Sequence, residues 1–212
     1  PSNSWSVERR NGETYLAINH QSEYTSKIVE SCDNLGNWIV NPASDASNLT
    51  LDQNEFVTGS ASFNFDIIVA QHVGNSASII NTALSAGDLA KYQIGGSWIF
   101  SVFIPDVTFF SSVTFQWGSD SSNHWLSSAT TPLNETAFTD GWNRVKVDWD
   151  TATKTGTPDV TNINYMSIAV DYTGSQTNAN DYRIDDIRII KPEQLTFYYL
   201  SWNVGKDAAG SS

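Results

Sequence analysis

The feature that most constrains the fold of this chain is the alternation of apolar and polar residues with a period of two. Phe63 and Phe65 are separated by one polar residue, so both rings fall on one face of an extended strand. Residues 113–117 and 144–149 alternate in the same way, whereas residues 97–105 are almost continuously apolar, as in a strand buried on both faces. The pattern predicts short β-strands along most of the chain.

Turn-forming sequences separate these segments. Gly, Asn, Asp and Ser cluster at residues 118–123, 155–159 and 174–180, and only residues 85–92 could form a helical turn. Many short strands without intervening helices favour a sandwich over a parallel α/β fold. We therefore expect an all-β chain folded as a two-sheet antiparallel β-sandwich.

The chain is expected to contain three segments. Residues 30–191 would form the sandwich, and residues 1–29, with a strand at 13–18, would be an N-terminal extension or the end of a preceding segment. Residues 192–212 contain an apolar strand at 195–202 that needs cover, because an exposed hydrophobic strand pairs with other chains. We expect this C-terminal segment to continue into, or pair with, another segment.

Composition excludes some partners. The net charge is −12, and nucleic-acid binding needs basic residues, so we expect no nucleic-acid partner. No apolar run reaches 18 residues, which predicts no membrane span. Ser, Thr and Asn fill the polar positions, as is common in virion and extracellular β-proteins, and we expect such a location. The single cysteine, Cys32, is expected to be a buried apolar residue.

No motif for catalysis is present. The three histidines, His20, His72 and His124, lack the spacing of metal ligands, and the sequence contains no nucleophile elbow, P-loop or dinucleotide-binding glycine pattern. We expect the protein not to be an enzyme.

Short motifs at three places carry a resemblance to known domains. Residues 30–38, 57–65 and 182–189 resemble the ends of carbohydrate-binding-module-like jelly rolls. The resemblance implies jelly-roll topology for the sandwich. It also implies a structural calcium ion held by an early acidic residue, a turn backbone and a late aspartate.

The positions that match this calcium site are Glu30, the backbone of residues 59–60, and Asp185 or Asp186. Adjacent strand residues face opposite ways, so only one of the two aspartates should point inward. An inward carboxylate needs a cation or several donors. The alternative to Ca²⁺ is therefore a carboxylate bonded to backbone amides or to Arg183 or Arg188.

A longer series of motifs resembles domains in structural proteins of tailed bacteriophages, those of tails, fibres or capsid decoration. The segments are 100–106, 113–125, 140–143, 148–149 and 155–159. This similarity implies a virion structural module that packs against copies of itself or other virion proteins, with glycan adhesion as an added role. The alternative function is a carbohydrate-binding module of a secreted enzyme or adhesin.

A turn flanked by Trp117 and Trp125 holds the candidate sugar site. An aromatic ring packs against the C–H face of a sugar while polar groups bond its hydroxyls, and Asp120, Asn123, His124 and Trp125 supply both. The alternative, which we favour, is a tight turn whose tryptophans fill the core. The same preference for the core holds for two further tryptophans, Trp142 and Trp149.

Overall fold

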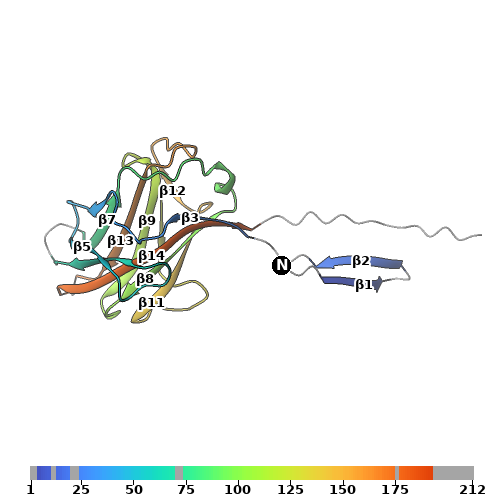
Figure 1. The fold of residues 1–212 in the computed structure, drawn as a ribbon, viewed down its shortest axis with the longest axis horizontal. Helices are drawn as coiled ribbons and strands as arrows, with labels where there is room; N and C mark the ends of the chain where they lie inside the picture. Colours follow the sequence, from blue (N-terminus) through green and yellow to red (C-terminus); the bar gives the residue numbers. More distant parts are fainter. Residues whose placement is uncertain (1–3, 11–12, 20–23, 70–73, 175–176, 193–212) are drawn as a thin grey trace, which may run out of the picture. The chain divides into compact units, whose positions relative to one another are not determined.

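The computed structural model describes residues 4–10, 13–19, 24–69, 74–174 and 177–192 (Figure 1). Residues 26–191 form one compact unit, which is the β-sandwich. The sandwich thus starts four residues before the expected position, because β3 (Tyr24–Glu30) pairs with β14 (Ala179–Pro192). The apolar strand expected at 195–202 lies outside the described residues.

The N-terminal segment contains a β-hairpin. β1 (Ser4–Arg10) and β2 (Glu13–Asn19) are antiparallel, with Ser4 opposite Asn19 and Arg10 opposite Glu13. The sequence predicted only the second of these strands.

The sandwich consists of two antiparallel sheets, as predicted. The first sheet has the strand order β12 (Thr153–Thr155), β10 (Asn123–Ala129), β9 (Phe110–Asp120), β13 (Tyr165–Tyr172), β7 (Ser76–Asn81) and β4 (Trp38–Val40). The second has the order β11 (Gly141–Asp148), β8 (Ser97–Ile104), β14, β6 (Ser62–Ile67) and β5 (Ala46–Asp52), and β3 joins it beside β14.

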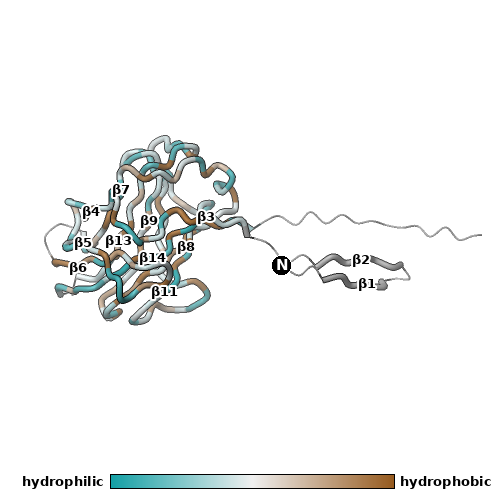
Figure 2. Tube along the Cα trace, viewed as in Figure 1, coloured by the Kyte–Doolittle hydropathy of each residue, from teal (hydrophilic) through white to brown (hydrophobic). Residues whose placement is uncertain are grey.

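Aromatic side chains fill the core between the sheets. Hydrophobic and polar residues follow one another along many strands (Figure 2). The side chains that point between the sheets are mostly hydrophobic and almost fully buried. Four tryptophans from both sheets form one cluster, in which ring centroids lie between 5.1 and 6.4 Å apart: Trp98, Trp117, Trp125 and Trp149. Because each buried large apolar side chain contributes about 1.5–3 kcal/mol, this cluster is a main source of the stability of the sandwich.

In the part of the chain that the structure describes, helical structure is confined to one short turn. The 3₁₀ helix η1 (Ala90–Tyr92) falls in the stretch where the sequence allowed a single helical turn. Within the described ranges no helix is long and apolar enough to cross a membrane. Cys32 is fully buried, as expected, and burial together with the charge of Glu30 raises the pKa of its thiol well above the usual value. Its sulfur is therefore a protonated part of the core.

Candidate functional site

The outer face of the first sheet carries small polar side chains. β9 alternates between core residues such as Phe115 and Trp117 and outward residues such as Thr114 and Gln116. Because directly paired residues on neighbouring strands share a face, the register of β9 with β10 and β13 extends this surface across three strands. We call it the polar face, and its polar members are Ser112, Thr114, Gln116, His124, Ser128, Tyr165, Ser167 and Asp171. Two apolar residues lie among them by the same register, Leu126 opposite Gln116 and Ala169 opposite Thr114.

Two rings lie at one end of the polar face. His124 and Tyr165 are both paired with Gly118, and their ring centroids lie 6.1 Å apart at an interplanar angle of 49°. A Cβ at Gly118 would lie 2.2 Å from the backbone oxygen of Asn123, so only glycine fits at this position of β9. Burial raises the pKa of Tyr165, and its protonated hydroxyl donates to Oε1 of Gln116 at 3.1 Å. Tyr165 is therefore held in place by a neighbouring strand.

A chain of hydroxyl groups occupies the opposite end. Ser112 Oγ and Thr114 Oγ1 donate to Oδ2 of Asp171 at 2.9 and 2.6 Å. Thr114 Oγ1 lies 2.8 Å from Ser128 Oγ. Since the single hydroxyl hydrogen of Thr114 points to Asp171, Ser128 is the donor in that pair.

The predicted sugar ligands Asp120 and Asn123 stabilise the turn between β9 and β10. Asp120 Oδ1 accepts from the backbone N–H groups of Ser122 and Asn123 at 2.8 and 2.9 Å. Hydrogen bonds from the Asn123 side chain and from these amides lower the pKa of Asp120. Asn123 Oδ1 in turn accepts from the backbone of Thr157 at 2.8 Å. Both side chains are exposed or half-buried, and sugar binding by them stays a prediction.

Trp125 and His124 are separated by the strand alternation. Trp125 is 5% exposed and packs against Trp117 and Trp149 in the core, as the preferred interpretation of the sequence had it. Its ring belongs to the core cluster between the sheets and not to an outer face, so its place in the predicted sugar site needs correction. His124 lies on the polar face, where its Nδ1 is 3.0 Å from the carbonyl oxygen of Ser121.

Glu30 and Asp185, two of the predicted calcium ligands, are bonded to N–H groups. Glu30 Oε2 accepts from the Trp38 indole nitrogen at 3.0 Å, and Oε1 accepts from a backbone amide. Asp185 Oδ2 accepts from the backbone of Val57 and Thr58 at 2.7 and 2.8 Å, and burial raises its pKa. A carboxylate has about four lone-pair sites, so both residues keep capacity for a cation.

Asp186 does not fit a calcium ligand. Its oxygens accept from Arg144 Nη1 at 2.7 Å and from Arg188 Nε at 2.9 Å. Both aspartates are buried, contrary to the strand-alternation argument, because a register irregularity after Asp185 and a φ of 54° at Asp186 interrupt the pleat. Among the described residues no three His, Cys, Asp or Glu side chains are grouped to hold a metal. Calcium binding through Glu30, Asp185 and backbone carbonyls stays a prediction.

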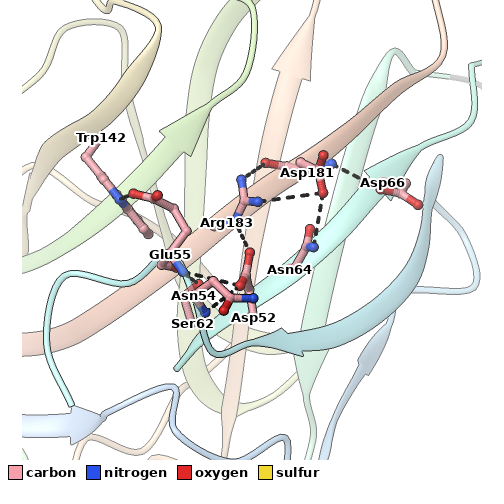
Figure 3. A network of polar contacts seen from close by, with 9 residues as sticks. All are labelled: Asp52, Asn54, Glu55, Ser62, Asn64, Asp66, Trp142, Asp181 and Arg183. Atoms are coloured by element: carbon pink, nitrogen blue, oxygen red, sulfur yellow. Dashed lines mark hydrogen bonds and ion pairs between the residues drawn. The ribbon is translucent and has the colours of Figure 1, made fainter. Parts of the chain in front are cut away.

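The outer face of the second sheet has a different character, because its charges pair with one another (Figure 3). Arg183 Nε donates to Asp52 Oδ2 at 2.8 Å, and Arg183 Nη1 donates to the carbonyl oxygen of Asp181 at 2.9 Å. Asn64 Nδ2 donates to the Asp181 carboxylate at 3.3 Å. The charged and amide groups of this network are therefore hydrogen-bonded to one another across β14, β6 and β5.

Trp142 lies beside this network rather than in the core, so the core prediction was wrong for this residue. Its indole N–H donates to Glu55 at 2.9 Å (Figure 3), and its ring meets Phe103 edge-on at 5.5 Å. Trp149, by contrast, is a core residue as predicted.

The fold has known counterparts. A family 30 carbohydrate-binding module matches with a TM-score of 0.54 and 13% identity, over 80% of this chain and 99% of that one. CtCBM11, a carbohydrate-binding module, matches with a TM-score of 0.51 and 16% identity, over 80% and 96% of the two chains. An exo-β-agarase matches with a TM-score of 0.53 and 12% identity, over 80% of this chain and a quarter (25%) of that one.

At these identities the likeness establishes the fold, a β-sandwich of the kind found in carbohydrate-binding modules. No protein-family model and no curated protein matches the sequence. Two of these neighbours are carbohydrate-binding modules, the class of the second function predicted from the sequence, and glycan binding by this chain stays a prediction. They hold no support for a bacteriophage origin, and the virion role stays a prediction.

The sequence did not single out Tyr165, Gln116 or Asp171 as site residues. The sequence held a signal for an outward face in residues 165–171, where Tyr, Ser, Ala and Asp alternate with the apolar residues Met, Ile and Val. Only the strand register shows that these positions adjoin the outward residues of β9.

Proposed function

We propose that the sandwich binds a polysaccharide or oligosaccharide on its polar face and works as a non-catalytic module outside the cell. The observation that carries the proposal is the polar face itself. It carries hydroxyl, amide and carboxylate groups from three strands, with Ser128 exposed and Ser112, Thr114, Gln116 and Asp171 half-buried, and it ends at the rings of Tyr165 and His124, which are 7% and 8% exposed. Sugars are recognised by this combination of ring faces and hydrogen-bonding groups.

The spacing of carboxylates on this face supports binding over hydrolysis. In the described part of its strands, Asp171 is the carboxylate of the face, and Asp120 ends β9 beyond the opposite end of the face. Asp171 is opposite Ser112, and Asp120 lies eight residues farther along β9, which at about 3.3 Å per residue is about 26 Å. Glycoside hydrolysis needs two carboxyl groups within about 10 Å.

The comparison with the second sheet also supports the choice of face. There Arg183 and Asp52 bond each other, so a ligand would have to displace an ion pair. On the polar face the hydroxyl groups keep free lone pairs and are open to solvent at Ser128. The fold likeness to two carbohydrate-binding modules is consistent with such a surface.

The test is affinity electrophoresis of the full chain through gels that contain neutral polysaccharides, among them β-glucans, mannan, xylan and agarose. We expect retardation by at least one polysaccharide and loss of retardation in Tyr165→Ala. Trp142→Ala is the matched control, because it removes an aromatic residue from the outer face of the second sheet. Retardation lost in Trp142→Ala but kept in Tyr165→Ala, or absent from every gel, would overturn the proposal.

A further inference from the structure

Resting on the proposed glycan-binding function, we propose that the polar face is an acceptor surface: it binds glycans through their hydrogen-bond donors, prefers those that carry a protonated amine, and rejects those that carry a carboxylate or sulfate. The proposal follows from the direction of each hydrogen bond on the face.

At one end of the polar face, Asp171 fixes the direction of the hydrogen bonds, that is, which group donates and which accepts. An ionised carboxylate has only acceptors, so both Ser112 and Thr114 must turn their hydroxyl hydrogens toward it. Thr114 then has no hydrogen for Ser128, and Ser128 must donate to Thr114. All three hydroxyl hydrogens are used within the face, and what remains toward solvent is lone pairs.

The other end follows the same rule. Tyr165 donates its hydrogen to Gln116 Oε1, and Ser167 is hydrogen-bonded to Tyr165, which lowers the pKa of that phenol in part. His124 Nδ1 faces a carbonyl oxygen, so in the neutral ring Nδ1 carries the hydrogen and Nε2 is an acceptor. The amide nitrogen of Gln116 is the donor that remains on this end.

The charge of Asp171 also favours a bound amine over a bound carboxylate. Asp171 is bonded to hydroxyl groups, and among the described residues no Lys or Arg forms an ion pair with it. On the second sheet, by contrast, Asp52 and Asp186 are neutralised by arginines. A bound amine would therefore meet an uncompensated negative charge, and a bound carboxylate would meet repulsion in a chain of net charge −12.

The test compares three forms of one glycan by isothermal titration with the full chain. The probes are the neutral glycan that retards the wild type, its 6-amino-6-deoxy derivative and its 6-carboxylate derivative, which differ in one group. One exposed ion pair contributes up to about 1 kcal/mol, so at low salt we expect about two- to fivefold tighter binding of the amine. We expect similarly weaker binding of the carboxylate, and both differences should shrink at high salt.

Asp171→Asn keeps an acceptor oxygen and removes the charge, so it should bring the three affinities together. Asp66→Asn makes the same change of net charge on the outer face of the second sheet and should leave the differences intact. Equal affinities in the wild type, or differences that persist in Asp171→Asn, would overturn the inference while glycan binding stands. Absence of binding to every form would instead overturn the proposed function.

Discussion

Arg183 Nε lies 2.8 Å from Oδ2 of Asp52, and both side chains are 12% exposed. The pair joins β14, which comes late in the described chain, to the end of β5. The guanidinium carbon of Arg183 also lies 4.7 Å from the centroid of the Phe103 ring. A hydrogen bond from the backbone of Asn54 adds to it and is the main reason why the pKa of Asp52 is lowered. The contact therefore links β14 to β5 across the intervening strand β6.

Asp52→Asn should destabilise the sandwich in a pH-dependent way. A lowered pKa means that the carboxylate stabilises the fold above its unfolded pKa of about 4 and loses this effect as the pH falls. Hydrogen bonds to charged groups contribute about 1.5–3 kcal/mol, so we expect a loss of that order at pH 7 and little difference near pH 2. Urea unfolding at both pH values measures this, with Glu135→Gln as an exposed charge control. An equal loss at both values would contradict the role of the ion pair.

Trp125→Phe separates packing from binding. Because Trp125 lies in the tryptophan cluster, a smaller ring should lower the free energy of unfolding by about 1–3 kcal/mol. Glycan affinity should stay within about twofold, since the polar face does not include this ring. Unfolding and titration calorimetry on the same variant measure both quantities. Unchanged stability with lost binding would place Trp125 in the site.

Tyr182→Phe should change stability only in alkali. Burial, with the charges of Asp106 and Asp140, raises the pKa of Tyr182 to about 12, while an unfolded tyrosine titrates near 10. The folded state therefore keeps a proton that the unfolded state loses, and stability falls as the pH rises from about 10 to about 12. The hydroxyl has no hydrogen-bond partner in the described residues, so the variant should be as stable as the wild type at pH 7. Tyrosinate absorbance and unfolding curves across this range test the shift; a wild type without this alkaline slope would contradict it.

Calcium should stabilise the sandwich if Glu30 and Asp185 hold it. A ligand at a hundredfold its dissociation constant adds about 2.7 kcal/mol, which raises the unfolding midpoint by several degrees. Thermal unfolding with Ca²⁺ and with a chelator measures this, and Glu30→Gln should abolish the shift. Asp186→Asn should instead destabilise under both conditions, because Arg144 and Arg188 lose their partner. No shift in the wild type would remove calcium from the account.

The strands of the core were predictable because burial imposes a period on the sequence. Residues 97–105 and 60–67 correspond to β8 and β6, and the rings of Phe63 and Phe65 both lie in the core. The position of Trp142 was not predictable in this way. A tryptophan on an alternating strand can face either layer, and here Phe103 and Glu55 hold it outside.

The polar face was hidden from the sequence for a different reason. Ser112, Thr114 and Asp171 are ordinary surface residues within their own strands, and nothing in a single strand links Asp171 to a serine almost sixty positions earlier. Register creates the link, and register depends on the whole sheet. The bulge that buries both Asp185 and Asp186 was hidden likewise, since it breaks the periodicity from which facing was inferred.

The most direct test of the account is to map glycan contacts on the folded chain by NMR. Backbone amide shifts are followed while a soluble oligosaccharide of the retained polysaccharide is added. The account predicts saturable shifts that concentrate in residues 112–118, 124–128 and 165–171 and leave β5 and β6 unchanged. Shifts confined to the second sheet or to the hairpin of β1 and β2 would contradict binding on the polar face.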